Sequence, residues 1–588
     1  MTLARLTEYF EKLEGTSSRL ALIDILCDLF TKVKALEIAK VCYLIQGRVA
    51  PFYEPLEIGM AEKTVAAAMA RAFGKEREQV LKEYGRVGDL GKVAEKLSSL
   101  RKQGSTNKKS HGSRIKYGMT VEEVFKTLTE IAKTTGEGTV EKKISTLSDL
   151  LRRVDGISAK HLVRIPLGTS RLGIGDPTIL DAFAQSKLGD RKKRKELEGA
   201  YNRTSDLGLI GEVLWTKGIR GIQGLDVSVG RPIRSQLAER LPDPKTILEK
   251  FGGAAHVQQK WDGFRVQIHK EGNKVRLFSR NLEETTPMFP DIIKGVLSQV
   301  KAKSAILDSE ALAFNPVSEE FLPFQETTKR RRKYGIEEMT KKLPLKAFVF
   351  DIMYLNGKSL MDQPLESRIK NLELRIKENE ILIPQVGEIT DSVERMEELF
   401  QDALTKGLEG LIVKRPFSKY EAGARNFNWV KLKRHSAGEL KDTIDCVILG
   451  YIYGRGKRAS FGAGALLVGV YDKDKDEFVT VSKIGTGLTD EEFREIHKRA
   501  DKIKVAHKPA RVNSILTPSV WIKPEIVIEV LADEITKSPV HTAGKVGSDP
   551  GYALRFPRLI KFRESDKKAE DATTVKELKE MYKQQYKR

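Results

Sequence analysis

The sequence is poor in cysteine. It contains only Cys27, Cys42 and Cys446, which lie far apart and form no C-x-x-C pair. This excludes zinc ribbons and domains held together by disulfides. The eight histidines show no metal-ligand spacing either, which argues against a structural zinc site. A reducing, cytoplasmic environment fits this composition.

Long apolar segments are also missing. No run is long enough to span a bilayer, so we expect no membrane association. The N-terminus, MTLARLTEYFEKLEG, has apolar residues at helical spacing among several glutamates. It is interpreted as a core helix rather than a targeting peptide, because transit peptides avoid acidic residues. The sequence contains no repeat of solenoid length and no long low-complexity segment.

Two familiar nucleotide-binding motifs are absent as well. The tripeptide GKS at 357–359 lacks the first glycine of a P-loop, because Ile352 stands there, and it is interpreted as a hairpin turn. The segment GRGKRA at 454–459 matches a loose dinucleotide-binding pattern. It is followed by the strand-like ALLVGVYD rather than by a helix, so we expect a basic loop between two barrel strands.

Positive charge is present in excess. The chain of 588 residues has 103 Lys and Arg against 81 Asp and Glu, a formal net charge of +22. Such an excess favours a polyanionic partner such as nucleic acid, although a generally charged surface would give the same count. The length predicts roughly two to four domains, each with its own core.

Helical periodicity dominates the first part of the chain, in segments such as RLALIDILCDLFTKV and VEEVFKTLTEIAK. After GRPIRSQLAERLPDPKTI the pattern changes to short alternating strands with glycine turns. Farther on, more strands surround a short helix that begins with the capping box Thr489–Glu492, and a second box, Thr574–Glu577, starts a terminal helix. We expect a multidomain α and α+β protein. Its domains would be an all-α domain at 1–235, an antiparallel-sheet domain at 236–440 and an OB-type β-barrel with a C-terminal helix at 441–588.

Two segments of the helical domain could contact an anion. Arg101–Gly118, RKQGSTNKKSHGSRIKYG, is interpreted as a mobile basic loop. In RLGIGDPTILDAF, Asp176 is predicted as the N-cap of a helix and Pro177 as its first residue. A helix start of this kind favours a phosphate, but a tight interhelical turn with an ordinary cap explains these residues equally well.

The stretch AHVQQKWDGFRVQIHK, Ala255–Lys270, contains the main candidate for chemistry. Apolar and polar residues alternate after the Asp-Gly dipeptide, which predicts a β-hairpin with Lys260 at the end of its first strand. A lysine is unreactive while protonated, so a nucleophilic Lys260 requires desolvation or nearby positive charge. Lys431 and Lys433, at alternate positions of NWVKLKR, could supply that charge or could be ordinary exposed strand residues.

Two carboxylates interrupt apolar segments. Glu310 in AILDSEALAF and Glu409 in GLEGLIVKR are embedded in apolar sequence, where an unpaired charge is unfavourable. Magnesium bridging to phosphate would account for both, and so would a core Arg or Lys paired with each. Phe350, in AFVFDIMYLNG, could be ordinary core or could stack on a base.

These signals belong to an ordered series. It consists of K-x-D-G-x-R (260–265), SRNLEETT (279–286), ILDSEALAF (306–314), FVFDIMYLNG (348–357), LEGLIVKR (408–415), NWVKLK (428–433) and RFPRLIKFRESDK (555–567). In order and spacing the series resembles the nucleotidyltransferase motifs of ATP-dependent DNA ligases. The helical part, with GRVAPFYEPLEIGMAEKTV and AYNRTSDLG, resembles the DNA-binding domain of archaeal and eukaryotic replicative-type ligases. The extra N-terminal module and cysteine zinc site of bacterial NAD-dependent ligases are not visible, so the implied cofactor is ATP.

Carried over to the matching positions, the resemblance implies that Lys260 is the nucleophile that becomes adenylated. Gln258 would lie at the adenine edge, where family members often have Glu, and Phe350 would stack on adenine. Arg265 and Glu310 would bind the ribose. The phosphates would be bound by Arg280, Arg425, Lys431 and Lys433. Glu310 and Glu409 would bind magnesium. Pyrophosphate would be oriented by Arg555, Arg558, Arg563, Asp566 and Lys567.

The resemblance further implies an enzyme that seals nicks in DNA replication, repair and recombination, with ATP and Mg²⁺, or Mn²⁺ in its place. The implied partners are nicked double-stranded DNA and a sliding clamp, and we expect a cytoplasmic, nucleoid-associated monomer. An RNA ligase or guanylyltransferase of the same superfamily would share the lysine motif, whereas a non-catalytic DNA-binding protein would explain only the charge. The basic runs at 191–195 and 329–333 fit contact with a duplex backbone or with solvent.

Overall fold

The computed structural model describes residues 1–105, 118–315, 321–322, 324–332, 334–377, 381–405, 408–433, 443–453, 462–485, 488–555, 557–563 and 567–585. The chain forms two compact units, Met1–Leu432 and Lys433–Arg588. The first unit has a helical part followed by a part built on two β-sheets, and the second unit is rich in β-strands. This agrees with the fold class expected from the sequence.

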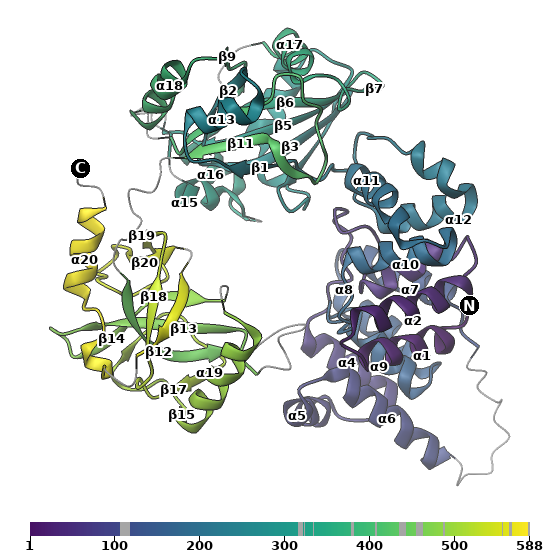
Figure 1. Ribbon diagram of the computed structural model, residues 1–588. Coiled ribbons are helices and arrows are strands. Elements are labelled where there is room, and N and C mark those ends of the chain that lie inside the picture. The colour runs from purple at the N-terminus through teal and green to yellow at the C-terminus, as the bar shows by residue number, and fades with distance from the viewer. Residues whose placement is uncertain are drawn as a thin grey trace. The chain divides into compact units, whose positions relative to one another are not determined.

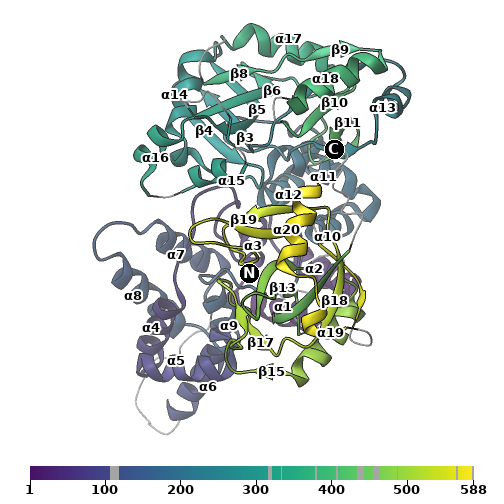
Figure 2. The same ribbon diagram turned by 90° about the vertical axis from the view of Figure 1, so that its left-hand side faces the viewer.

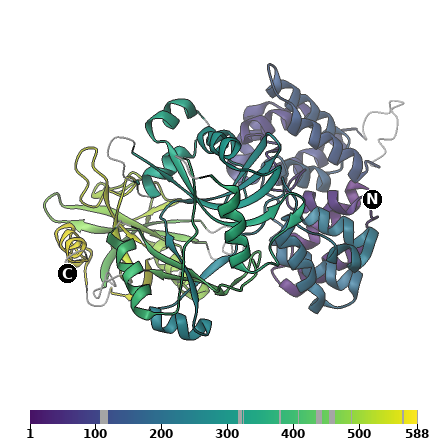
Figure 3. The same ribbon diagram turned by 90° about the horizontal axis from the view of Figure 1, so that it is seen from above.

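Helices are the regular elements of the described residues up to Gln223, as the purple-to-blue part of Figure 3 shows. They are α1 (Leu3–Glu14), α2 (Arg19–Thr31), α3 (Ile38–Ile45), α4 (Glu62–Phe73), α5 (Arg77–Val87), α6 (Leu90–Ser105), α7 (Val121–Lys133), α8 (Thr139–Arg152), α9 (Gly156–Arg164), α10 (Asp176–Leu188), η1 (Arg191–Lys193), α11 (Arg194–Thr204) and α12 (Leu207–Gln223). The α-helices among them share one continuous core, because each carries apolar residues on one side. Among the described residues, no helix combines the length and apolar character that a membrane crossing needs.

The predicted basic loop is partly wrong. Helix α6 extends to Ser105, so residues 101–105 are helical. The remaining residues of that prediction up to 117 lie outside the described part of the chain.

The predicted cap of α10 is also wrong. Gly175 is the N-cap, and Asp176 is the first residue of the helix. The Asp176 carboxylate instead accepts hydrogen bonds from Gln46 Nε2 (3.2 Å), Tyr201 Oη (2.5 Å) and Arg234 Nη2 (2.9 Å). A carboxylate with three donors of the protein itself therefore occupies the helix start at which a phosphate was considered.

The two sheets that follow the helical part are drawn in teal and green in Figure 1. The five-stranded sheet has the order β1-β11-β10-β2-β9, with β1 (Leu237–Arg240), β2 (Ala255–Lys260), β9 (Glu388–Thr390), β10 (Gly410–Lys414) and β11 (Arg425–Lys433). The six-stranded sheet has the order β4-β3-β5-β6-β7 with β8 beside β6, and its strands are β3 (Phe264–Glu271), β4 (Lys274–Ser279), β5 (Ser304–Ala313), β6 (Leu345–Leu355), β7 (Lys358–Ser359) and β8 (Leu382–Pro384).

Helices pack on each sheet. Apolar residues of α14 (Pro290–Gln299) and α17 (Leu365–Arg375) join the core of the six-stranded sheet, whereas α13 (Pro244–Phe251) and α18 (Val393–Thr405) cover the five-stranded one. The short helices are η2 (Thr286–Met288), α15 (Phe324–Thr327), η3 (Thr328–Arg330) and α16 (Ile336–Lys342). The expectation of strands joined by glycine turns missed all of these helices.

The hairpin predicted at 255–270 does not form. Strand β2 pairs with β9 and β10, whereas β3 pairs with β4 and β5 of the other sheet. A Cβ atom on Gly263, between β2 and β3, would lie 2.3 Å from the carbonyl oxygen of Ala311 on β5. Glycine thus permits a close approach of backbones where the chain changes sheets. Lys260 therefore ends a strand at the border between two sheets.

The second predicted turn, at GKS, is confirmed. Strands β6 and β7 pair as a hairpin across Asn356 and Gly357, whose φ angles are 45° and 91°. Positive φ at both central residues is the requirement of a type I′ turn.

The second unit is centred on β12, which pairs with β13, β17 and β18. Its strands are β12 (Ile444–Ile452), β13 (Ala465–Asp472), β14 (Glu477–Ile484), β15 (Lys504–Val505), β16 (Val512–Asn513), β17 (Val520–Ile522), β18 (Val527–Leu531), β19 (Glu534–Ser538), β20 (Gly551–Arg555) and β21 (Arg558–Phe562). Helices α19 (Asp490–Lys502) and α20 (Val575–Gln584) lie on different sides of these strands (Figure 2), and η5 (Ala569–Asp571) is a short turn. Both predicted capping boxes, at Thr489 and Thr574, are confirmed. Residues 454–459, expected as a basic loop, lie outside the described residues.

Candidate active site

The side chain of Lys260 forms an ion pair at the border between the two sheets. Its Nζ lies 2.6 Å from Glu409 Oε2, and the two side chains are 19% and 18% exposed. Strand pairing creates this contact, because the Glu409 N–H donates to Lys260 O (3.1 Å) and Gly410 lies opposite Lys260 in the β10–β2 ladder. Lys260 is thus largely withdrawn from bulk water and held by two strands, a setting in which a lysine can act as a nucleophile.

Glu310 on β5 lies opposite Arg265 on β3. Burial raises the pKa of the Glu310 carboxyl to about 7, while Lys260 and Arg265 oppose part of this rise and Asp308 and Glu409 add to it. Several carboxylates are therefore close enough to repel one another. Carboxylate oxygens are ligands that Mg²⁺ prefers, and a divalent cation would relieve their repulsion.

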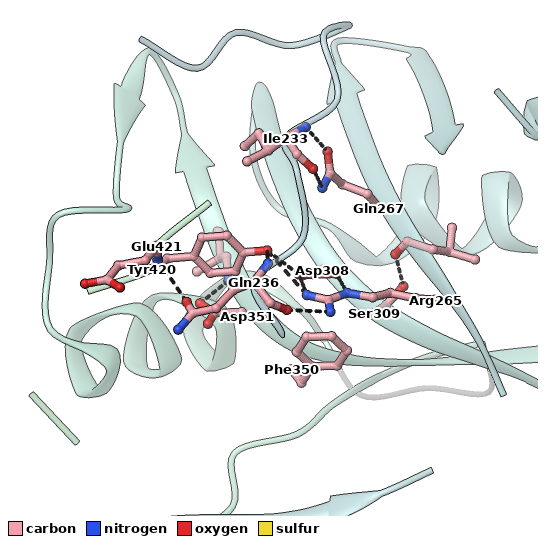
Figure 4. Close-up of polar contacts among 12 residues, drawn as sticks. Ile233, Gln236, Arg265, Gln267, Asp308, Ser309, Phe350, Asp351, Tyr420 and Glu421 are labelled. Atoms are coloured by element: carbon pink, nitrogen blue, oxygen red, sulfur yellow. Dashed lines mark hydrogen bonds and ion pairs between the residues drawn. The ribbon is translucent and has the colours of Figure 1, made fainter. Parts of the chain in front are cut away.

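Arg265 is fixed by a buried network (Figure 4). Its Nε and Nη2 donate to the two oxygens of Asp308 at 2.9 and 2.5 Å, and Nη1 donates to Gln236 O at 2.8 Å. Asp308 is 0% exposed and also accepts a hydrogen bond from the Tyr420 hydroxyl (2.8 Å). A paired and hydrogen-bonded carboxylate of this kind orients the planar guanidinium in a single direction.

Phe350 on β6 is half-buried and lies among cations. Arg265 Cζ is 5.3 Å and Lys414 Nζ 4.9 Å from the centroid of its ring. Lys414 is 0% exposed and donates to Phe350 O (3.0 Å), and burial lowers the pKa of Lys414 to about 7. Trp429 meets the Phe350 ring edge-on, with centroids 6.0 Å apart. Phe350 is only partly buried and packs against a core cluster, so both alternatives, core residue and ligand contact, fit its position.

Gln258 lies two residues before Lys260 on β2 and is 3% exposed. Its Nε2 donates to Gln385 O (2.7 Å) and Phe350 O (3.4 Å), which fixes the orientation of the amide. In the part of the chain that the structure describes, Gln258 Oε1 has no hydrogen-bond partner. The site therefore contains a buried acceptor that a ligand could satisfy.

The candidate phosphate-binding residues occupy strands and strand ends of the same part. Arg280 directly follows β4, Arg425 begins β11, and both are exposed. Lys431 and Lys433 are half-buried and alternate with buried residues along β11. Alternation places both lysines on the face that also carries Trp429.

The candidate pyrophosphate-orienting residues belong to the second unit, where each described one forms an ion pair. These pairs are Arg555–Glu534 (2.6 Å), Arg558–Asp533 (2.7 Å), Arg563–Glu529 (3.0 Å) and Lys567–Asp445 (2.5 Å). Asp566 lies outside the described residues.

The two basic runs differ in accessibility. Residues 191–193, which form η1, are exposed. In the run at 329–333, Arg330 is only 1% exposed, and its guanidinium donates to both oxygens of Asp291 at 3.0 Å. Arg330 is therefore a structural residue, and neither contact with a duplex backbone nor contact with solvent, the two alternatives for this run, describes its side chain.

Asp308, Lys414 and Tyr420 belong to the site but were not assigned from the sequence. Asp308 could have been found, because it lies two residues before Glu310 in the same apolar strand. Lys414 likewise ends an apolar strand as a buried charge. Tyr420 lies in the connection between β10 and β11, where no periodic pattern marks it.

Comparisons with known proteins agree along the whole chain. Three family profiles match: "DNA ligase N terminus" at residues 2–184, "ATP dependent DNA ligase domain" at 235–433 and "ATP dependent DNA ligase C terminal region" at 459–567. The chain is 47% identical to the "Probable DNA ligase" of Dictyoglomus turgidum, covering 100% of this chain and 98% of that protein. It is 41% identical to the "DNA ligase" of Sulfolobus acidocaldarius, covering 99% and 98%. The solved structure "Pmar-Lig_Pre." has a similar fold, with a TM-score of 0.51 and 17% identity over 95% of this chain and 99% of that one.

Proposed function

The chain belongs to the ATP-dependent DNA ligase family, and from this premise we propose that Lys260 is the nucleophile that becomes adenylated. As a member of the family it is an enzyme that uses ATP and forms phosphodiester bonds in DNA. One observation carries the assignment. Lys260 ends β2 in an ion pair with Glu409, at the border with the sheet that holds Arg265, Glu310 and Phe350.

The nucleotide is bound by residues of both sheets. Adenine stacks on Phe350, and its 6-amino group donates to the buried Oε1 of Gln258, while Arg265 and Glu310 bind the ribose. The fixed amide of Gln258 and the fixed guanidinium of Arg265 support these roles, because each leaves polar atoms available to a ligand. The phosphates are bound by Arg280, Arg425, Lys431 and Lys433, and pyrophosphate is oriented by Arg555, Arg558, Arg563, Asp566 and Lys567.

Glu310 and Glu409 would hold Mg²⁺, and Mn²⁺ would fit the same oxygen ligands. The position of Glu310 supports this role, since it is half-buried and its carboxyl lies close enough to Asp308 and Glu409 for these carboxylates to raise its pKa. The bound cation would supply stabilisation of negative charge on the phosphates.

The chemistry of the chain itself follows from these positions. Lys260 Nζ loses a proton to solvent and attacks the α-phosphorus of ATP. The bond to pyrophosphate breaks as the P–N bond forms, which gives lysyl-AMP. AMP then passes to the 5′-phosphate of a nick and frees Lys260. The 3′-hydroxyl attacks the activated phosphate, AMP leaves, and the strand is sealed.

The substrate is nicked double-stranded DNA, and the enzyme serves replication, repair and recombination as a nucleoid-associated cytoplasmic monomer with a sliding clamp as its partner. The net charge of +22 and the exposed basic residues at 191–193 support contact with a duplex backbone.

The assignment is tested by incubating the protein with Mg²⁺ and α-labelled ATP and then adding nicked duplex. We expect label that survives denaturation on the wild-type protein and moves to the nick, and none on Lys260→Ala. Lys419→Ala is the matched control, because Lys419 is an exposed lysine paired with Asp362 (3.0 Å). Label retained by folded Lys260→Ala would show that another residue is the nucleophile.

A further inference from the structure

We propose that Tyr420 is a positioning residue of this site, whose hydroxyl, acting through Asp308, holds Arg265 at the ribose and joins the two sheets between which ATP reacts. The inference rests on the proposed role of Arg265 in binding the ribose. Tyr420 itself does not touch the nucleotide in this proposal.

The Tyr420 hydroxyl uses its full hydrogen-bonding capacity inside the protein. It donates to Asp308 Oδ2 (2.8 Å) and accepts from the Gln236 backbone N–H (3.2 Å) and from Arg265 Nη2 (3.4 Å). Figure 4 shows these groups converging on the hydroxyl, and Tyr420 is 3% exposed. A hydroxyl can donate one hydrogen bond and accept two, so its removal would leave three buried groups one partner short.

The contacts of Tyr420 cross from one sheet to the other. Tyr420 lies in the connection between β10 and β11, and Gln236 directly precedes β1; these three strands belong to the five-stranded sheet. Asp308 on β5 and Arg265 on β3 belong to the six-stranded sheet. Lys260 lies on the first sheet, whereas the ribose-binding residues lie on the second. The hydroxyl that orients Arg265 therefore also fixes the ribose-binding strands relative to the strand of the nucleophile.

The network uses most of the N–H donors of Arg265 and fixes the orientation of its guanidinium. Asp308 takes the N–H of Nε and one of Nη2, and Gln236 O takes one of Nη1. The guanidinium lies against Phe350 and Trp429, with Cζ 5.3 and 5.7 Å from the ring centroids. A guanidinium has five N–H donors, and among the described residues the second N–H of Nη1 has no acceptor, so it is available for a ribose hydroxyl. Loosening Asp308 would allow that donor to turn away.

The test is Tyr420→Phe, which removes the hydroxyl and keeps the ring that packs edge-on against Trp429 (5.6 Å between centroids). In self-adenylation we expect the KM for ATP to rise about tenfold, while kcat changes less than about threefold. This size of effect on the KM corresponds to the loss of one hydrogen bond to a buried charge. The preference for ATP over 2′-deoxyATP and 3′-deoxyATP should fall as well. Tyr43→Phe is the matched control, because the Tyr43 hydroxyl also donates to a buried carboxylate, that of Asp206 (2.7 Å). This variant should change neither the KM for ATP nor the ribose preference.

A double variant shows whether Tyr420 acts through Arg265. In Tyr420→Phe/Arg265→Lys the fold-loss in ATP affinity should be smaller than the product of the two single losses. Losses that multiply, or a folded Tyr420→Phe with wild-type KM and ribose preference, would overturn the inference. If Tyr420→Phe does not fold, Asp308→Asn, which keeps shape and one acceptor, should lose ribose preference, and an unchanged preference would overturn the inference.

Arg265→Lys alone separates this inference from the proposed function. If Arg265→Lys loses ribose preference and Tyr420→Phe does not, only the role of Tyr420 fails. If Arg265→Lys keeps the full preference, the ribose assignment of Arg265 fails and the inference falls with it.

Discussion

Lys260 Nζ and Glu409 Oε2 lie 2.6 Å apart, so the proposed nucleophile is one half of an ion pair before any substrate binds. The same carboxylate is a proposed ligand of magnesium. A cation that binds Glu409 would compete with Lys260 for it and would free the lysine for attack. Under these proposed roles, the ion pair would couple metal binding to the reactivity of Lys260.

Glu409→Gln should make this coupling visible. The amide is a poorer ligand for a hard cation, so we expect the Mg²⁺ concentration that gives half-maximal self-adenylation to rise by at least roughly tenfold. The measurement is incorporation of label from ATP across a magnesium titration. Glu397→Gln on α18 is the control, because its carboxylate accepts only from exposed Gln401 Nε2 (2.8 Å) in the described contacts. Identical titrations for both variants would remove Glu409 from the metal site.

Base selectivity should depend on the amide of Gln258. Its Nε2 is committed to Gln385 O and Phe350 O, and Oε1 has no hydrogen-bond partner among the described residues, so the proposed adenine site would use Oε1 as an acceptor. The 6-amino group of adenine can donate to it, whereas the 6-oxo group of guanine would leave two acceptors facing each other. We expect Gln258→Leu to lower the preference for ATP over GTP by roughly tenfold to a hundredfold, measured as the ratio of kcat/KM in self-nucleotidylation.

Gln258→Glu is a second test of the hydrogen bonds that orient this side chain. An ionised carboxylate cannot donate to the two carbonyl oxygens, so we expect weaker ATP binding as well. A variant that binds ATP as the wild type does would mean that the amide orientation is not fixed by these carbonyls.

From the sequence, candidate site residues could be named, but their arrangement could not be predicted. Lys260, Arg265, Glu310 and Phe350 each stand in a short motif, so their chemistry could be recognised locally. The pairing of β2 could not, because its partners β9 and β10 lie far along the chain. A turn dipeptide after a strand therefore suggested a hairpin where the chain in fact changes sheets. Tyr420 shows the same limit, since only the folded chain brings its loop to Asp308.

Gly263 should be intolerant of a side chain, because a Cβ there would lie 2.3 Å from the Ala311 carbonyl oxygen. That oxygen belongs to a strand and cannot move freely. We expect Gly263→Ala to lower the free energy of unfolding of the first unit by about 3 kcal/mol and to slow self-adenylation, as Lys260 is displaced. The control is Gly85→Ala in α5, where an added Cβ would have no atom of the described residues within 4 Å and the helix should gain up to about 1 kcal/mol. Thermal melting of both variants checks the prediction, and equal melting temperatures would contradict it.

The carboxyl of Glu310 should make stability depend on pH. Burial raises its folded-state pKa to about 7 from an ordinary value of 4.5. Between these values the folded protein binds more protons than the unfolded chain, so this group lowers stability as pH rises through the window. In metal-free protein we expect Glu310→Gln to raise the free energy of unfolding more at pH 8 than at pH 5, with a difference on the order of 2 kcal/mol between the two pH values. Melting temperatures of the variant and the wild type, measured at both pH values, check this. A difference that does not vary with pH would show that Glu310 is ionised throughout.

The helical part touches the loop that carries Tyr420. Gly423 N–H donates to Arg234 O (2.9 Å), and Arg234 N–H donates to Asn202 O (2.8 Å) on α11. Gly423 has a φ of +71°, and a Cβ there would lie 2.7 Å from Asn202 Nδ2. A side chain at 423 would either turn the Asn202 side chain away or shift the loop from α11, and a shift of the loop would reach Asp308 through Tyr420.

We accordingly expect Gly423→Ala to raise the KM for ATP severalfold although Gly423 is not among the proposed nucleotide-binding residues. The matched control is Gly74→Ala, which has a similar φ of +66° with nothing within 4 Å of the added Cβ. Both substitutions should lower the free energy of unfolding by about 1 kcal/mol, because an alanine is disfavoured at a positive φ angle. This penalty is local to the substituted residue. Only Gly423→Ala should change the KM, since only there does the added atom meet a neighbour. An unchanged KM in Gly423→Ala would mean that the loop holds Tyr420 in place independently of the helical part.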